Sequence, residues 1–235
     1  MRLYLSSERL GERTRALLAM LPEGRQEKLP DFSGSTARPQ RLAPRVAVIA
    51  NGYDGASATA REIYRTEVYD PVAEFKALGL DPHEVDLRAH FGDAASLRQR
   101  LGSFDLVWVM GGNSFVLRRA MKQSGFDTII RDRLERDTIA YGGYAAGAVV
   151  AGPTLRGLEL MDDPFELPEH YDEPPIWSGL GLTPFAIVPH YRSRHPEAAA
   201  AEKVVSYMRA RRTRFRAISD GEVIVQTGGL ERLAS

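Results

Sequence analysis

Residues 105–115 read DLVWVMGGNSF, a continuous apolar run that leads directly into two glycines and the start of a helical pattern. An apolar run without polar alternation is typical of a strand that is buried on both faces. Glycines allow a tight turn and leave backbone N–H groups free at a helix start. The segment therefore predicts strand, glycine turn and helix, which is the repeating unit of a parallel sheet.

The same alternation continues along the chain. A second buried strand is predicted at residues 45–50 (RVAVIA), with shorter strands at 3–5, 84–87, 138–141, 185–188, 215–218 and 222–225. Helices are predicted at residues 11–21, 58–78, 94–101, from 114 onward, 126–136 and 196–211. This order predicts an α/β fold with a doubly wound, mostly parallel sheet flanked by helices.

Residues 22–44 interrupt the pattern, because they are rich in Pro, Gly, Ser and Arg and have no apolar period. Such composition predicts a loop or mobile connection. We expect residues 1–235 to form a single domain around one core, since 235 residues with 43% hydrophobic content can bury one.

Charge and cysteine content exclude several classes of function. Lysine plus arginine and aspartate plus glutamate both total 31, so no net field favours nucleic acid or an anionic membrane. The chain has no cysteine, which excludes disulfides, thiolate metal sites and a cysteine nucleophile. No apolar run approaches the roughly 18 residues of a membrane span, and no signal-like segment opens the chain, so a cytoplasmic protein is expected.

A second glycine turn lies at residues 143–148, which read GYAAGA after a predicted strand. In the nucleophile elbow G-x-S-x-G, the glycines allow a sharp turn that projects a central serine, and the next N–H joins an oxyanion hole. Ala145 stands at the serine position and has no oxygen for attack on a carbonyl. Taken alone, the segment is equally typical of a tight packing turn.

Four segments occur in one order: GGNSF at 111–115, GYAAGA at 143–148, PTLR at 153–156 and PHY at 189–191. Together they resemble the peptidase E family, the S51 serine peptidases that include aspartyl dipeptidases. The resemblance covers roughly residues 45–225. It implies a three-layer sandwich similar to class I glutamine amidotransferases and flavodoxin, although the cysteine nucleophile of those amidotransferases is absent.

The resemblance also implies site roles. Ala145 takes the nucleophile position, and His190, which follows a predicted strand, takes the role of general base. The N–H groups of Gly112 and Ala146 are expected to form the oxyanion hole. Hydrolysis of this kind needs no cofactor, and we expect no metal.

The acid that orients the histidine is less well defined, because the aspartate of the family aligns with Leu160. Glu159 is adjacent and is the first candidate for this role, with Asp162 and Asp163 as alternatives. All three are also typical of solvated loop acids.

Substrate contacts are expected from Asn113, Arg192 and Arg194, because the two arginines, with neighbouring His195, offer cations for an acidic side chain. The same arginines are equally typical of a solvated helix start. The expected partner is a short peptide with N-terminal aspartate, bound by a monomer or a homodimer.

Two main hypotheses follow. The first is a serine exopeptidase or dipeptidase whose nucleophile has been replaced by alanine, since the surrounding motif is otherwise intact. The second is a natural pseudoenzyme that binds peptides or a related metabolite without cleaving them. A cyanophycinase-like hydrolase is a weaker alternative, because the loops here are short.

Overall fold

The computed structural model describes residues 1–22, 25–27, 40–172 and 174–228. Its centre is a six-stranded sheet in the order β10-β1-β7-β6-β4-β5. Neighbouring strands are parallel except at the edge, where β10 runs antiparallel to β1. These strands are β1 Arg2–Ser6, β4 Arg45–Ile49, β5 Asp81–Glu84, β6 Leu106–Val109, β7 Ala140–Tyr144 and β10 Val223–Thr227.

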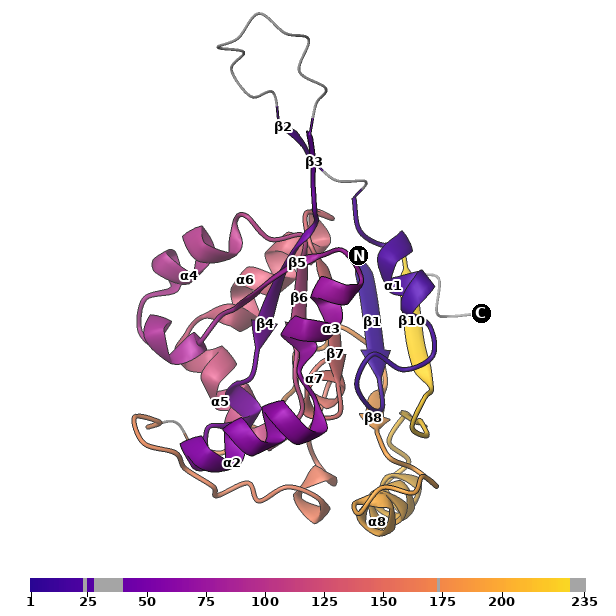
Figure 1. The fold of residues 1–235 in the computed structure, drawn as a ribbon. Coiled ribbons are helices and arrows are strands. Elements are labelled where there is room, and N and C mark those ends of the chain that lie inside the picture. The colour runs from indigo at the N-terminus through magenta and orange to yellow at the C-terminus, as the bar shows by residue number, and fades with distance from the viewer. Residues whose placement is uncertain (23–24, 28–39, 173, 229–235) are drawn as a thin grey trace, which may run out of the picture.

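Helices cover both faces of the sheet, which confirms the predicted mostly parallel α/β fold in three layers (Figure 1). The α-helices are α1 Thr14–Ala19, α2 Ala58–Ile63, α3 Pro71–Ala77, α4 Ala94–Leu101, α5 Ser114–Gln123, α6 Phe126–Glu135, α7 Ala146–Val149 and α8 Ala198–Ala210. Four single turns complete the set: η1 Asn51–Tyr53, η2 Tyr64–Val68, η3 Leu87–His90 and η4 Leu158–Leu160.

Alternating strand residues feed two different cores, because side chains along a strand point to opposite faces. In β6, Val107 and Val109 pack with α4, α5 and α6, whereas Leu106 and Trp108 pack on the side of α1 and α3. A third cluster joins the parallel pair β8 Ala186–Val188 and β9 Phe215–Ala217 to α8. Burial on both faces explains why the central strands lack polar alternation.

Three segments differ from the sequence-based expectations. A helix was predicted over residues 58–78, but the helical chain ends with η2 at Val68, and Asp70 caps a new helix that begins at Pro71. Proline favours the first position of a helix and restricts the residue before it to extended conformations. A strand was predicted at residues 84–87, but β5 begins three residues earlier, at Asp81, and ends at Glu84. Within the predicted loop 22–44, β2 Arg25–Glu27 and β3 Gln40–Leu42 form an antiparallel pair, and residues 28–39 lie outside the described residues.

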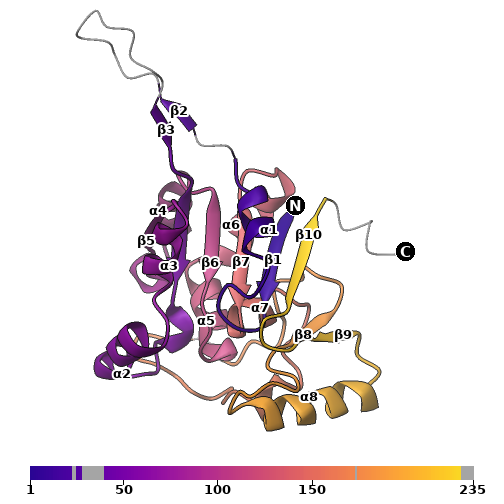
Figure 2. The same cartoon turned by 45° about the vertical axis from the view of Figure 1, so that its right-hand side comes forward.

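The carboxyl ends of the parallel strands meet at one edge of the sheet, where α2 and α8 also lie, while β2 and β3 lie beyond the opposite end (Figures 1 and 2). Ligand sites of open α/β sheets gather at this carboxyl edge. None of the helices in the described part of the chain combines the length and the apolar character that a membrane crossing requires.

The short helix α7 approaches the end of β6 closely because residue 147 is glycine. A Cβ atom on Gly147 would lie 2.1 Å from the carbonyl oxygen of Val109 and 3.1 Å from that of Met110. Backbone carbonyls cannot move aside without moving the strand. The approach of α7 to the sheet therefore depends on this glycine.

We expect Gly147→Ala to lower the free energy of unfolding by about 1–3 kcal/mol through overpacking against β6. Urea unfolding followed by circular dichroism measures this difference. Gly102→Ala is a matched control, since Gly102 has an ordinary right-handed conformation and its nearest contact for a Cβ is at 3.1 Å. Equal stability of the two variants would contradict the close approach of α7.

Candidate active site

The turn between β7 and α7 has the backbone of a nucleophile elbow. Ala145 has φ 45° and ψ −117°, a conformation that costs a residue other than glycine about 1–3 kcal/mol. Its N–H points at the carbonyl oxygens of Ser6 (3.3 Å) and Ser7 (3.2 Å) at the end of β1. The elbow geometry is therefore present although the serine side chain is not.

The glycine turn after β6 lies against this elbow. A Cβ on Gly111 would lie 3.3 Å from the Cβ of Ala145, and Gly112 has φ 95°, which favours glycine. Among the described residues, the N–H groups of Gly112 and Ala146 donate to no protein oxygen. Both predicted oxyanion donors are thus free to bind a ligand oxygen.

Asn113 mainly holds the turn in place. Its Oδ1 accepts the N–H groups of Phe115 (2.8 Å) and Val116 (3.2 Å), which caps α5. Its Nδ2 donates to the carbonyl of Asp163 at 2.8 Å and to the carboxylate of Glu166 at 2.6 Å. Asn113 was predicted to contact the substrate, but these contacts already use both the oxygen and the nitrogen of its side-chain amide.

His190 follows β8 and is only 3% exposed, with φ 59°. Its Nδ1 lies 2.8 Å from the Oδ1 of Asp220. Because a carboxylate only accepts hydrogen bonds, Nδ1 carries the proton and Nε2 is left with a lone pair. This is the arrangement that a general base requires.

Asp220, which the sequence analysis missed, occupies the place expected for the orienting acid. It follows β9, whose pairing with β8 brings the two strand ends side by side. The available signal was its position two residues after a predicted strand, before Gly221. Ligand sites of open α/β sheets gather at the carboxyl ends of strands, so this position indicates a site residue even without a motif.

Ser7 joins the elbow to this histidine–aspartate pair. Its hydroxyl donates to Asp220 Oδ1 at 2.8 Å and accepts the backbone N–H of His190 at 2.7 Å. Its carbonyl meanwhile faces the N–H of Ala145. One fully buried serine therefore links the ends of β1, β7, β8 and β9.

The three acids proposed from the sequence lie elsewhere. Glu159 accepts the N–H of Gly157 within its own loop at 2.5 Å. Asp163 accepts the N–H of Phe165 at 2.9 Å. Neither has a contact with His190 among the described residues, so the structure brings Asp220 to His190 instead.

Asp162 is directed at the start of α5. Its Oδ2 accepts the N–H of Ser114 at 2.9 Å and the hydroxyl of Ser114 at 2.5 Å. Burial raises the pKa of Asp162 to about 6, although both contacts with Ser114 lower it. The carboxyl group is thus ionised at neutral pH and gains a proton in mild acid.

The loop after His190 carries the predicted substrate arginines. Arg192 pairs with Glu202 on α8 at 3.4 Å and lies over the ring of Tyr191. Arg194 is exposed and lines a shallow pocket of about 390 Å³ that also contains His195 and Asp220. Of the two predicted cations, Arg194 is the one without a protein carboxylate partner among the described residues.

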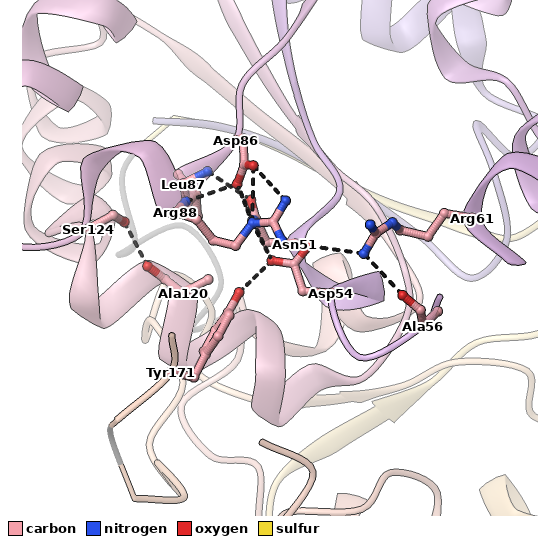
Figure 3. A network of polar contacts seen from close by, with 10 residues as sticks. All are labelled: Asn51, Asp54, Ala56, Arg61, Asp86, Leu87, Arg88, Ala120, Ser124 and Tyr171. Carbon is pink, nitrogen blue, oxygen red and sulfur yellow. Dashed lines mark hydrogen bonds and ion pairs between the residues drawn. The ribbon is translucent and has the colours of Figure 1, made fainter. Parts of the chain in front are cut away.

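A second cavity, of about 320 Å³, lies at the carboxyl ends of β4 and β5. A polar network borders it, in which Asn51 Nδ2 donates to Asp54 at 2.7 Å and to Asp86 at 2.8 Å (Figure 3). Tyr171 donates to Asp54 at 2.6 Å. The network fixes η1. The carbonyl of Gly52 in η1 accepts the backbone N–H of Asn113, the residue after the Gly111-Gly112 turn.

Tyrosines connect this cavity to the elbow. Tyr53 and Tyr64 line the cavity, and their hydroxyls lie 3.3 Å and 3.1 Å from that of Tyr144, which immediately precedes Ala145. Burial raises the pKa of Tyr53 and of Tyr144 above the ordinary tyrosine value. Both hydroxyls therefore stay neutral and can donate hydrogen bonds at neutral pH.

Comparisons with known proteins identify the family of this chain. The profile described as peptidase family S51 matches residues 55–233. The chain is 32% identical over 133 residues to an uncharacterized peptidase of Listeria innocua, covering 55% of this chain and 58% of that protein. It is 31% identical over 137 residues to peptidase E of Salmonella arizonae, covering 58% and 56%. The matched segment thus spans less than two thirds of either relative.

Solved structures show the same fold. The crystal structure of a Listeria monocytogenes protein assigned to peptidase E superposes with a TM-score of 0.65 and 21% identity, covering 97% of this chain and 98% of that one. A peptidase from an acI-B1 Actinobacterium gives a TM-score of 0.62 with 14% identity, over 96% and 82% of the two chains. Because the family profile covers well over half of the sequence, the chain belongs to peptidase family S51.

Proposed function

We propose that this protein carries the binding site of a serine dipeptidase for short peptides with N-terminal aspartate, and that Ala145 removes its ability to cleave them. The observation that carries the proposal is the elbow backbone at Ala145, with φ 45° and ψ −117°. An unfavourable conformation persists only where its surroundings impose it, and such strain clusters at active sites.

The groups around the elbow support serine chemistry at this position. A serine hydroxyl at 145 would lose its proton to Nε2 of His190 as its oxygen forms a bond to the peptide carbonyl carbon. The N–H groups of Gly112 and Ala146 would bind the resulting oxyanion. His190 would then pass the proton to the leaving amine, and water would release the acyl group.

Arg194 is the group that we assign to the acidic side chain of the substrate. It is exposed and lines a pocket together with His195 and with Asp220, the residue that contacts His190. An arginine can bind a carboxylate with two parallel hydrogen bonds.

Restoring the nucleophile tests the proposal. We expect Ala145→Ser to cleave Asp-X dipeptides, with a turnover on the order of a million-fold above that of the present chain, since removal of a catalytic serine costs about that much. Chromatographic analysis of a dipeptide library measures both the rate and the preference for the first residue.

Ala145→Gly is the matched control, because it relaxes the backbone without supplying an oxygen, and it should remain inactive. A folded Ala145→Ser protein that cleaves no dipeptide would overturn the proposed function. Peptide binding without cleavage by that variant would favour the pseudoenzyme hypothesis.

The identity of the orienting acid gives a second test in the Ala145→Ser background. We expect Asp220→Asn to lower kcat by roughly 10³–10⁴-fold, since an amide at this place no longer holds the histidine in the required tautomer. Glu159→Gln should change kcat by less than about threefold, because the carboxylate of Glu159 bonds within its own loop and has no contact with His190 among the described residues. Steady-state kinetics that show the larger loss in Glu159→Gln would reverse the assignment.

A further inference from the structure

His190, His195 and Glu197 form a cluster on the loop between β8 and α8. Each offers one atom that can bind a metal ion, and these three atoms lie within 4.8 Å of one another. His190 is buried, His195 is half-buried and Glu197 is exposed. The cluster is thus anchored in the protein on one side and open to solvent on the other.

His190 has the surroundings of a metal ligand. The contact between its Nδ1 and Asp220 at 2.8 Å fixes the ring and leaves Nε2 available. Histidines that bind metals usually donate their other N–H to a carboxylate in this way, which orients the ring and makes it a better ligand. Nε2 faces the Glu197 carboxylate at 3.9 Å.

Glu197 has no arginine or lysine partner among the described residues, and its carboxylate lies within ion-pair distance of His190. A small closing movement of this exposed side chain would bring its oxygen and Nε2 of His190 to about 2.0–2.2 Å from one ion.

His195 is close enough to supply the third ligand. Its ring is stacked on that of His190, with centroids 3.7 Å apart and planes inclined by 10°. Parallel rings do not point their nitrogens at one ion, so His195 must turn on binding. This rotation of the ring breaks one long hydrogen bond, in which Nδ1 of His195 accepts the backbone N–H of Glu197 at 3.2 Å. The exposed Glu197 N–H can bond to water instead.

The charges around the cluster favour a cation. Besides Glu197 itself, the carboxylate of Asp220 lies 2.8 Å from Nδ1 of His190. Of the nearby arginines, Arg192 is neutralised by Glu202 at 3.4 Å, and Arg194 is exposed and lines the adjacent pocket together with His195.

We propose that His190, His195 and Glu197 form a Zn²⁺ site with one position open for water or a small ligand. Two imidazoles and one carboxylate are a common ligand set of open zinc sites, whereas Mg²⁺ and Ca²⁺ prefer oxygen ligands. The inference goes beyond the proposed function and does not depend on it, because Zn²⁺ would bind the present Ala145 chain. A bound ion would occupy the Nε2 that acid–base chemistry requires.

Titration calorimetry of the metal-free full-length chain with ZnCl₂ tests the site. We expect one ion per chain, and binding weakened roughly ten-fold or more in both His195→Ala and Glu197→Gln. We expect Asp220→Asn to weaken binding about 10–100-fold, because it removes the group that orients His190. MgCl₂ should give no binding.

His170→Ala is the matched control, because His170 is an exposed histidine beside Glu169, at 3.7 Å, and lies outside the cluster. It should bind Zn²⁺ as the unmodified chain does, and metal-free melting curves should show that all variants fold. Absence of binding, or equal binding by the unmodified chain, His195→Ala and Glu197→Gln, would overturn the proposal.

The zinc site and the proposed peptidase function can be tested independently of each other. If Ala145→Ser cleaves peptides, Zn²⁺ should inhibit cleavage, and EDTA should restore it. If Ala145→Ser is inactive, calorimetry of the Ala145 chain still decides whether the zinc site exists.

Discussion

The N–H of residue 145 faces two carbonyl oxygens at the end of β1, and the rest of the site depends on this contact. It holds the chain in a left-handed conformation at the point where β7 gives way to α7. The segment at the end of β1 also places the Ser7 hydroxyl against Asp220 and the backbone N–H of His190. The turn at Ala145, His190 and Asp220 are therefore all positioned by one short segment at the end of β1.

Such a buried network is stable only when every member has its partner. A hydrogen bond contributes little when it replaces one to water, but an unpaired buried group costs about 1–3 kcal/mol. The network needs no oxygen at position 145, because no contact of Ser7, His190 or Asp220 described above uses a side chain there. An alanine at this position is therefore compatible with a complete network.

The sequence was sufficient for the parts of the fold that local patterns determine. The buried strands 106–109 and 45–49 and the helix 94–101 follow directly from apolar runs and helical periods. The elbow could be predicted because its glycines are local requirements of the turn. The strand at 81–84 was displaced in the prediction because its sequence, DPHE, carries little apolar signal.

Contacts between distant segments could not be read in this way. Asp220 reaches His190 through the pairing of β8 with β9, and Ser7 arrives from the other end of the chain. Neither residue belongs to a motif, and the resemblance predicted the orienting acid near Leu160. The stacking of His195 on His190 likewise depends on how the intervening loop folds back.

The position of β1 has a consequence for how the molecule folds. The strand lies between β7 and β10, so Arg2 pairs with Ala140 on one side and with Thr227 on the other. Both pairings close very long loops, and such contacts form slowly because chain entropy is lost before they stabilise anything. The conformation at Ala145 needs β1 in place, so we infer that the candidate active site forms late in folding.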